Sequence, residues 1–138
     1  KIWPLKNYIE ICRYLESKNY QIVFYLGPNE KDYEKVLKQN FQNAIFLENE
    51  ELLNSFSNIE IIMTSTKFLK FAISNDSGVS HMLSTNYCPL IKLFGPKDSV
   101  KFTPKLKNLI TVSSSELNSD KIEDISISRV IKAIEDLD

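Results

Sequence analysis

The chain alternates between short apolar runs and segments in which apolar residues recur every three or four positions. The runs at residues 20–26, 44–47, 90–94 and 109–112 are rich in β-branched, aromatic and other apolar residues. Two of them, 20–26 and 90–94, stop at a Gly-Pro pair. Runs of this length and composition predict strands that are buried in a sheet.

Helical spacing of apolar residues predicts four helices between and around these runs. They cover residues 4–17, 30–39, 79–86 and 128–137. Pro4 suits the first turn of the first helix, where its missing N–H has no partner to lose. In the last helix we expect Val130, Ile131 and Ile134 to face the core.

Residues 48–74 are less regular. Apolar positions at 52, 53 and 56 are compatible with a short helix, and residues 59–67 fit either a helix or a strand. We favour a helix over 59–67 and a strand over 69–74, because a strand has to lead into the polar turn that follows.

The repeated alternation of strand and helix, with connections too long for hairpins, predicts a parallel sheet with helices on both faces. The predicted fold class is therefore α/β and Rossmann-like. No internal repeat or linker is apparent, so we expect residues 1–138 to form one domain.

The composition is that of a soluble globular protein: 43% hydrophobic residues, 25% charged residues and a formal net charge of -1 over 138 residues. The lysines are dispersed, so nucleic acid is not an expected partner. No apolar run approaches the roughly 18–20 residues of a membrane span and no signal peptide opens the chain, which favours a cytoplasmic location. Because the first residue is Lys1 rather than Met, we expect the chain to be part of a longer protein.

Cys12 and Cys88 follow no metal-ligand spacing. A disulfide or a reactive thiol is one interpretation, and a pair of small buried hydrophobic residues is the favoured one.

Three turns follow predicted strands, at the carboxyl edge where Rossmann-like sheets bind ligands. They are Gly27-Pro28-Asn29-Glu30, Asn75-Asp76-Ser77-Gly78 and Phe94-Gly95-Pro96. In the middle turn the predicted helix begins at once, and its first N–H groups are suited to a phosphate. Ser77 adds a hydroxyl, Gly78 permits close approach of the backbone, and His81 lies one turn further on.

Other interpretations of this turn stay open. Asp76 or Ser77 could simply cap the helix. Ser77 and His81 could form a nucleophile and base, although no third orienting residue is evident. A single His is a poor metal site, so we predict no bound metal.

The middle and last turns lie in a sequence that resembles the signature of the heptosyltransferase family, glycosyltransferase family 9. The resemblance rests on four segments: Ser74-Asn75-Asp76-Ser77-Gly78-Val79-Ser80-His81-Met82, Pro89-Leu90-Ile91-Lys92-Leu93-Phe94-Gly95-Pro96-Lys97-Asp98, Lys1-Ile2-Trp3-Pro4 and Leu26-Gly27-Pro28-Asn29-Glu30. The order and spacing of the four segments agree with the family pattern and extend over about three-quarters of the chain. Two features depart from it: the element expected near residues 55–59 is unclear, and Lys97 stands where many members have Thr.

The resemblance implies the C-terminal, donor-binding half of a two-domain GT-B enzyme whose N-terminal half is absent from this chain. By carry-over, Lys1 contacts the donor phosphates and Glu30, beside Gly27, the ribose. Asp76 reaches the sugar, Ser77 and Gly78 hold the pyrophosphate, and His81 supports their loop. Gly95 and Pro96 complete the donor site, and the nucleobase is expected near residues 55–59.

The function that this implies is inverting, metal-independent transfer of a sugar from a nucleotide sugar to a lipopolysaccharide core acceptor. ADP-heptose is the favoured donor, no further cofactor is expected, and the general base would come from the N-terminal half. Association with the inner face of the cytoplasmic membrane is left open. The alternatives are a non-catalytic sugar-nucleotide or phosphate-binding module and a purely structural domain.

Overall fold

The computed structural model describes residues 2–27, 30–47, 58–75, 78–83, 88–95 and 108–137, except for the side chains of Asn58, Val79 and His81. Contacts divide the chain into two compact units. The N-terminal unit is Leu5–Ile62, and the C-terminal unit combines Lys1–Pro4 with Met63–Asp138.

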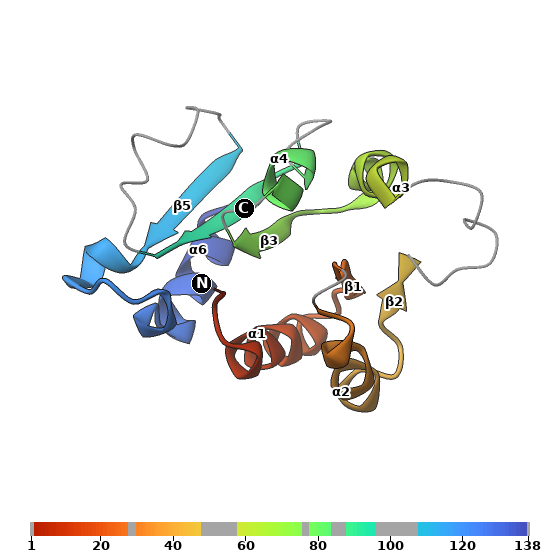
Figure 1. The fold of residues 1–138 in the computed structure, drawn as a ribbon, viewed down its shortest axis with the longest axis horizontal. Helices are drawn as coiled ribbons and strands as arrows, with labels where there is room; N and C mark the ends of the chain where they lie inside the picture. Colours follow the sequence, from red (N-terminus) through yellow and green to blue (C-terminus); the bar gives the residue numbers. More distant parts are fainter. Residues whose placement is uncertain are drawn as a thin grey trace. The chain divides into compact units, whose positions relative to one another are not determined.

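The N-terminal unit contains α1 (Leu5–Ser17), β1 (Val23–Phe24), α2 (Asp32–Asn40) and β2 (Ile45–Phe46) (Figure 1). After α1 the chain turns at Asn19, whose φ of 67° lies in the left-handed region that Asn tolerates better than most residues. Asp32 and Glu34 in the first turn of α2 complement the positive end of its dipole. The buried side chains of this unit are Ile11, Cys12, Leu15, Ile22, Leu37, Phe41, Phe46, Ile61 and Ile62.

Two predicted strands of this unit are shorter than expected. The runs at 20–26 and 44–47 form β1 and β2, each two residues long, which pair in parallel with Val23 opposite Ile45. One further hydrogen bond, from the N–H of Ile45 to the carbonyl of Ile22 (2.9 Å), precedes the pair. A parallel strand extends only as far as its partner accepts hydrogen bonds, so the shorter run at 44–47 limits both.

The helix expected at 59–67 is confirmed as α3 (Asn58–Ser65), which continues into the 3-10 helix η4 (Thr66–Phe68). The strand predicted at 69–74 begins later, as β3 (Ala72–Asn75). The N–H of Leu69 closes η4 by donating to Thr66 (3.3 Å), and pairing with the next strand begins only at Ala72, which donates to Pro89 (2.9 Å). The short helix considered near residues 52–56 lies outside the described residues.

The C-terminal unit is built on a parallel three-stranded sheet in the order β3-β4-β5. β4 (Leu90–Phe94) has the predicted bounds, and β5 (Leu109–Ser113) is one residue longer than predicted. Figure 1 shows α4 (Gly78–Leu83) and α6 (Ile127–Asp136) on opposite faces of this sheet. The prediction of parallel strands between helices is confirmed, but the described strands form two hydrogen-bonded groups rather than one continuous sheet.

The buried residues of the C-terminal unit lie mainly in β4 and on one side of α6, which contacts β5. All five residues of β4 are buried, as expected of a central parallel strand. On α6, Val130 and Ile134 face inward as predicted, whereas Ile131 is half-buried and Ala133 is fully buried in its place. Two 3-10 helices, η6 (Ser114–Leu117) and η7 (Ile122–Asp124), connect β5 to α6. Among the described helices, none has the length and apolar character needed to cross a bilayer.

Candidate functional site

Two of the predicted site residues lie at the carboxyl edge of the three-stranded sheet. β3, β4 and β5 end at Asn75, Phe94 and Ser113, and the parallel register places Asn75 opposite Leu93 and Phe94 opposite Ser113. Gly78 begins α4 and Gly95 directly follows β4, so both lie next to the ends of neighbouring strands. This is the edge at which doubly wound sheets bind ligands.

The segment that follows Lys1 is fixed at the same edge. The backbone N–H of Trp3 donates to Oδ1 of Asn75 (3.1 Å), and its indole Nε1–H donates to the carbonyl of Ile125 (2.9 Å). Trp3 is fully buried, so the packing of its ring anchors the segment in addition to the two hydrogen bonds. Lys1 itself lies outside the described residues. Sequence reasoning treated Asn75 only as part of the turn and missed its role in holding Trp3.

Gly95 stands in ordinary surroundings. Its carbonyl accepts a hydrogen bond from Oγ of Ser113 (3.4 Å), and a Cβ built on it would lie 3.6 Å from Cβ of Ile122, a normal van der Waals distance. Its φ is not positive. Neither the backbone conformation nor crowding by the described residues therefore requires glycine at this position.

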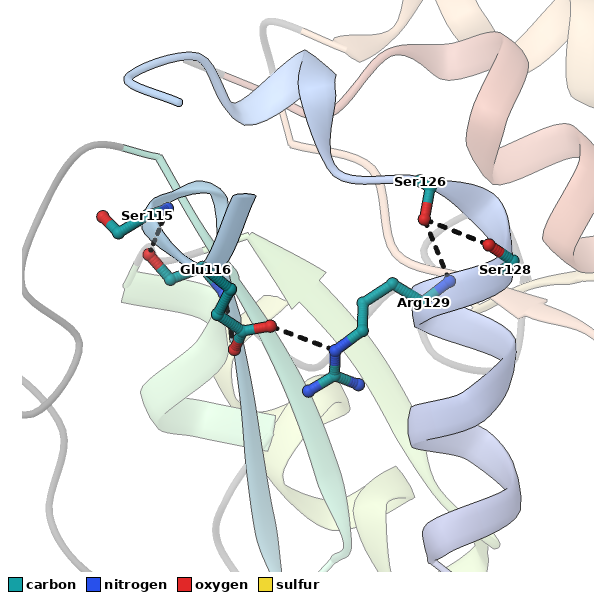
Figure 2. Close-up of polar contacts among 6 residues, drawn as sticks. Ser115, Glu116, Ser126, Ser128 and Arg129 are labelled. Carbon is teal, nitrogen blue, oxygen red and sulfur yellow. Dashed lines mark hydrogen bonds and ion pairs between the residues drawn. The ribbon is translucent and has the colours of Figure 1, made fainter. Parts of the chain in front are cut away.

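The end of β5 is held by a polar network that joins it to α6. Ser113 and Glu116 form a capping box on η6, in which Oγ of Ser113 accepts from the N–H of Ser115 (3.2 Å). Figure 2 shows Arg129 of α6 reaching Glu116, with Nε 3.0 Å from Oε2. Oγ of Ser126 caps α6 by accepting from the N–H of Arg129 (3.1 Å). The network therefore connects the end of β5 to two helices, η6 and α6.

The first Gly-Pro turn belongs to the N-terminal unit. The N–H of Gly27 donates to Oε2 of Glu30 (2.8 Å), and the N–H of Glu30 donates to the carbonyl of Gly27 (3.0 Å). Glu30 was predicted to contact the ribose of the donor, and one of its carboxylate oxygens is thus hydrogen-bonded within its own turn. A Cβ on Gly27 would lie 3.5 Å from that oxygen, again an ordinary distance.

The charge of the Glu30 carboxylate affects the pKa of Tyr8 on α1. Burial raises the pKa of the Tyr8 phenol well above its ordinary value, and the negative charge of Glu30 raises it further, with a smaller contribution from Cys12. Because the phenol stays neutral, Tyr8 adds no second negative charge to the Glu30 turn.

Residues 1–129 match the family model described as Glycosyltransferase family 9 (heptosyltransferase). The chain belongs to this family. It is 28% identical over 110 residues to "Lipopolysaccharide heptosyltransferase 2" of Salmonella typhimurium, an alignment that covers 78% of the chain and 30% of that protein. It is 27% identical over 135 residues to "Lipopolysaccharide heptosyltransferase 1" of Campylobacter coli, which covers 94% of the chain and 39% of that protein.

Solved structures of the family share the fold. A glycosyl transferase family 9 protein from Veillonella parvula superposes with a TM-score of 0.79 at 20% identity, over 98% of this chain and 41% of that one. The E. coli heptosyltransferase WaaC with ADP gives 0.79 at 22% identity, over 99% and 40%. The predicted Rossmann-like half of a GT-B fold is confirmed. The chain spans about a third of the length of the curated relatives it matches.

Several residues of the family signature fall outside what the structure describes. Asp76, Ser77 and Pro96 are not among the described residues, nor is Lys97. His81 lies within α4, but its side chain is not described. Of the predicted nucleobase segment, only the start of α3 is described, where Ile59 is 57% exposed.

The two cysteines of this family 9 chain are buried and free. Burial, followed by the charge of Glu16, raises the pKa of the Cys12 thiol to about 12, and burial also raises that of Cys88. Both therefore behave as small hydrophobic residues, as favoured from their spacing. Within the described residues, no group of three His, Cys, Asp or Glu side chains could hold a metal ion.

Proposed function

We propose that this chain is the donor-binding half of a lipopolysaccharide heptosyltransferase. The whole protein would transfer a heptose from ADP-heptose to a lipopolysaccharide core acceptor. The proposal is supported by the position of three residues at one edge of the three-stranded sheet: Asn75 ends β3, Gly78 begins α4 and Gly95 follows β4. A solved relative, the E. coli heptosyltransferase WaaC, binds ADP and ADP-2-deoxy-2-fluoro heptose.

In this proposal the edge of the C-terminal unit holds the diphosphate of the donor. Backbone N–H groups at the start of α4, Ser77 and Lys1 stabilise the negative charge that develops on the leaving diphosphate. The attachment of Trp3 to Asn75 (3.1 Å) supports this role for Lys1, because it fixes the chain two residues away. Asp76 contacts the sugar, and His81 and Pro96 support the loops on either side.

The glycines are consistent with close approach of a ligand. Neither Gly95 nor Gly27 has a positive φ, and a Cβ at either position would meet the described residues only at ordinary distances. A bound donor that lies against the backbone would explain why both positions are glycine, which has no side chain to obstruct it. In the Gly27 turn, the second carboxylate oxygen of Glu30 would accept hydrogen bonds from the ribose hydroxyls.

The reaction would be a direct displacement that inverts the anomeric centre. A general base outside this chain would take the acceptor proton, and no metal would be needed because fixed donors and lysine meet the diphosphate charge. The chain alone would bind donor without turning it over. Its place would be the cytoplasm, near the membrane that carries the lipid-linked acceptor.

Isothermal titration calorimetry with ADP and ADP-heptose tests the donor site. We expect both ligands to bind the folded chain, unchanged by EDTA, and Asp76→Ala to weaken ADP-heptose more than ADP. Absence of binding at millimolar ligand, with folding confirmed by circular dichroism, would contradict the proposal. Heptose transfer is then assayed in the full-length protein. Binding without transfer there would identify a non-catalytic module.

A further inference from the structure

The hydroxyl of Ser113 links the backbone of Gly95 to the neighbouring strand. Pairing of β4 with β5 ends where Phe94 lies opposite Ser113, and Gly95 is the first residue beyond this pair. Oγ of Ser113 donates to the carbonyl of Gly95 across a distance of 3.4 Å. Glycine restrains its own backbone less than any other residue, so the backbone at Gly95 depends on contacts of this kind to keep one conformation.

A second hydrogen bond determines how the Ser113 hydroxyl can be used. Its Oγ accepts from the backbone N–H of Ser115 (3.2 Å). A serine hydroxyl has a single proton to donate, and because the N–H of Ser115 occupies an acceptor position of Oγ, that proton is available to Gly95. Ser113 is 5% exposed, so water competes little for the hydroxyl. The bond to Gly95 is long for a hydroxyl donor, and its strength therefore depends on how firmly Oγ is held.

Glu116 and Arg129 hold Ser113 in place. Oε1 of Glu116 accepts from the backbone N–H of Ser113 (3.5 Å), and Oε2 accepts from Nε of Arg129 (3.0 Å). Figure 2 shows this carboxylate between the end of β5 and α6. Because the bond from Arg129 joins a positive to a negative group, it is stronger than a bond between neutral groups. The position of the Ser113 hydroxyl is therefore determined by α6 as well as by its own strand.

We propose that Ser113 is a positioning residue of the donor site, which holds the backbone of Gly95 in the conformation that a nucleoside diphosphate contacts. The inference rests on the proposed function, in which the donor lies against Gly95. Ser113 is buried, so it acts on the donor through Gly95 and not by direct contact. A backbone that already has its bound conformation loses less conformational entropy on binding, and donor affinity rises without a further contact.

Four variants of the full chain test the role of the hydroxyl. Ser113→Ala removes it, and Ser113→Thr and Ser113→Val introduce side chains of nearly equal size, of which only the first carries a hydroxyl. Ser119→Ala is the matched control, because it removes a hydroxyl that accepts from the N–H of Lys121 (3.1 Å) in the same unit. Calorimetric titration with ADP should show at least fivefold weaker binding to Ser113→Ala and Ser113→Val. Ser113→Thr and Ser119→Ala should bind ADP within twofold of the unmodified chain.

Nuclear magnetic resonance measures the hydrogen bond itself. Glycine labelled with ¹³C at the carbonyl gives three signals, one for each glycine of the chain, and Gly95→Ala identifies the signal of Gly95. We expect this signal to move upfield in Ser113→Ala and Ser113→Val, because the carbonyl loses its hydroxyl donor. It should keep its position in Ser113→Thr. A signal that stays in place in all three variants would show that Ser113 does not hold Gly95.

The outcomes separate this inference from the function on which it rests. If the unmodified chain binds no ADP, the proposed function fails and the role of Ser113 in the donor site fails with it. If the unmodified chain binds ADP, and Ser113→Val binds it as tightly as Ser113→Thr, only the role of Ser113 is overturned. A lower melting temperature of Ser113→Val would then limit Ser113 to capping η6. An equal loss of ADP affinity in Ser119→Ala would also overturn the role, because ADP binding would then follow the stability of the unit.

Discussion

The backbone N–H of Trp3 donates a hydrogen bond to Oδ1 of Asn75, 72 residues further along the chain (3.1 Å). Asn75 is the last residue of β3, so the bond joins the opening segment of the chain to the strand end that precedes Asp76. The indole of Trp3 adds a second bond to Ile125 and a fully buried ring. Two segments of the family signature are therefore held together through Trp3 and Asn75.

Asn75→Ala should destabilise the C-terminal unit by about 1 kcal/mol, because the Trp3 N–H loses its acceptor in a partly buried place. Asn75→Asp is the matched control, since a carboxylate oxygen at the same position can still accept that bond. Urea denaturation gives the free energy of unfolding for each variant. Equal losses for the alanine and aspartate variants would show that the hydrogen bond to Trp3 contributes nothing.

Tyr8 gives a prediction about pH. Its pKa is raised by burial first and by the Glu30 carboxylate second. A phenol whose pKa is higher in the folded than in the unfolded protein stabilises the fold fully below the unfolded value of about 10, and this contribution is lost as the pH rises beyond it. The free energy of unfolding should therefore fall with increasing pH above about 10.

Glu30→Gln separates the two causes of this shift. Removing the negative charge should lower the pKa of Tyr8, while burial still keeps it above the ordinary value. The amide oxygen can continue to accept from Gly27, so the turn is retained. Ultraviolet difference titration of tyrosine ionisation measures the change, with Tyr8→Phe identifying the signal. An unchanged Tyr8 titration in Glu30→Gln would contradict the assigned influence of Glu30.

The sequence predicted the order of the elements better than their lengths. The bounds of β4 could be read from Leu90 to Phe94 because a central strand is apolar on both faces and stops at Gly95. The run at 20–26 contracted to two paired residues, since a strand's length also depends on its partner, which a local pattern does not show. β3 starts later than predicted because Leu69 closes η4 and pairing with the neighbouring strand begins only at Ala72.

The candidate site was predictable only where its residues form a contiguous pattern. Gly78 and Gly95 follow strands in the sequence, so parallel topology alone places them at one edge. The bond between Asn75 and Trp3 was missed because no local signal connects residues so far apart. Lys92 belongs to the run that was predicted to be a buried strand, and it is buried together with the apolar residues of that strand.

The two thiols should resist modification while the chain is folded. With a pKa of about 12, roughly one Cys12 thiol in ten thousand is ionised at pH 8, and only the thiolate reacts. Cys88 is buried, and its pKa is raised as well. Ellman's reagent should release little colour from the native chain at pH 8 and two equivalents in guanidinium chloride, one for each cysteine. Rapid reaction of one equivalent in the native chain would contradict the buried, neutral state.

Gly95→Ala separates folding from ligand binding at the carboxyl edge. The added Cβ would meet Ile122 at an ordinary 3.6 Å, and the φ of Gly95 is not positive, so alanine fits the folded backbone. Alanine also restricts the unfolded chain, so the free energy of unfolding should stay within about 0.5 kcal/mol of the original or rise slightly.

If a donor lies against this backbone, as proposed, the methyl group of Gly95→Ala occupies part of its place and ADP should bind about tenfold more weakly. Thermal unfolding and calorimetry on the same preparation measure both quantities, and Ser128→Ala on α6 serves as a surface control. Unchanged ADP affinity in a stable Gly95→Ala variant would remove Gly95 from the donor site, because the one change expected to matter there would have had no effect.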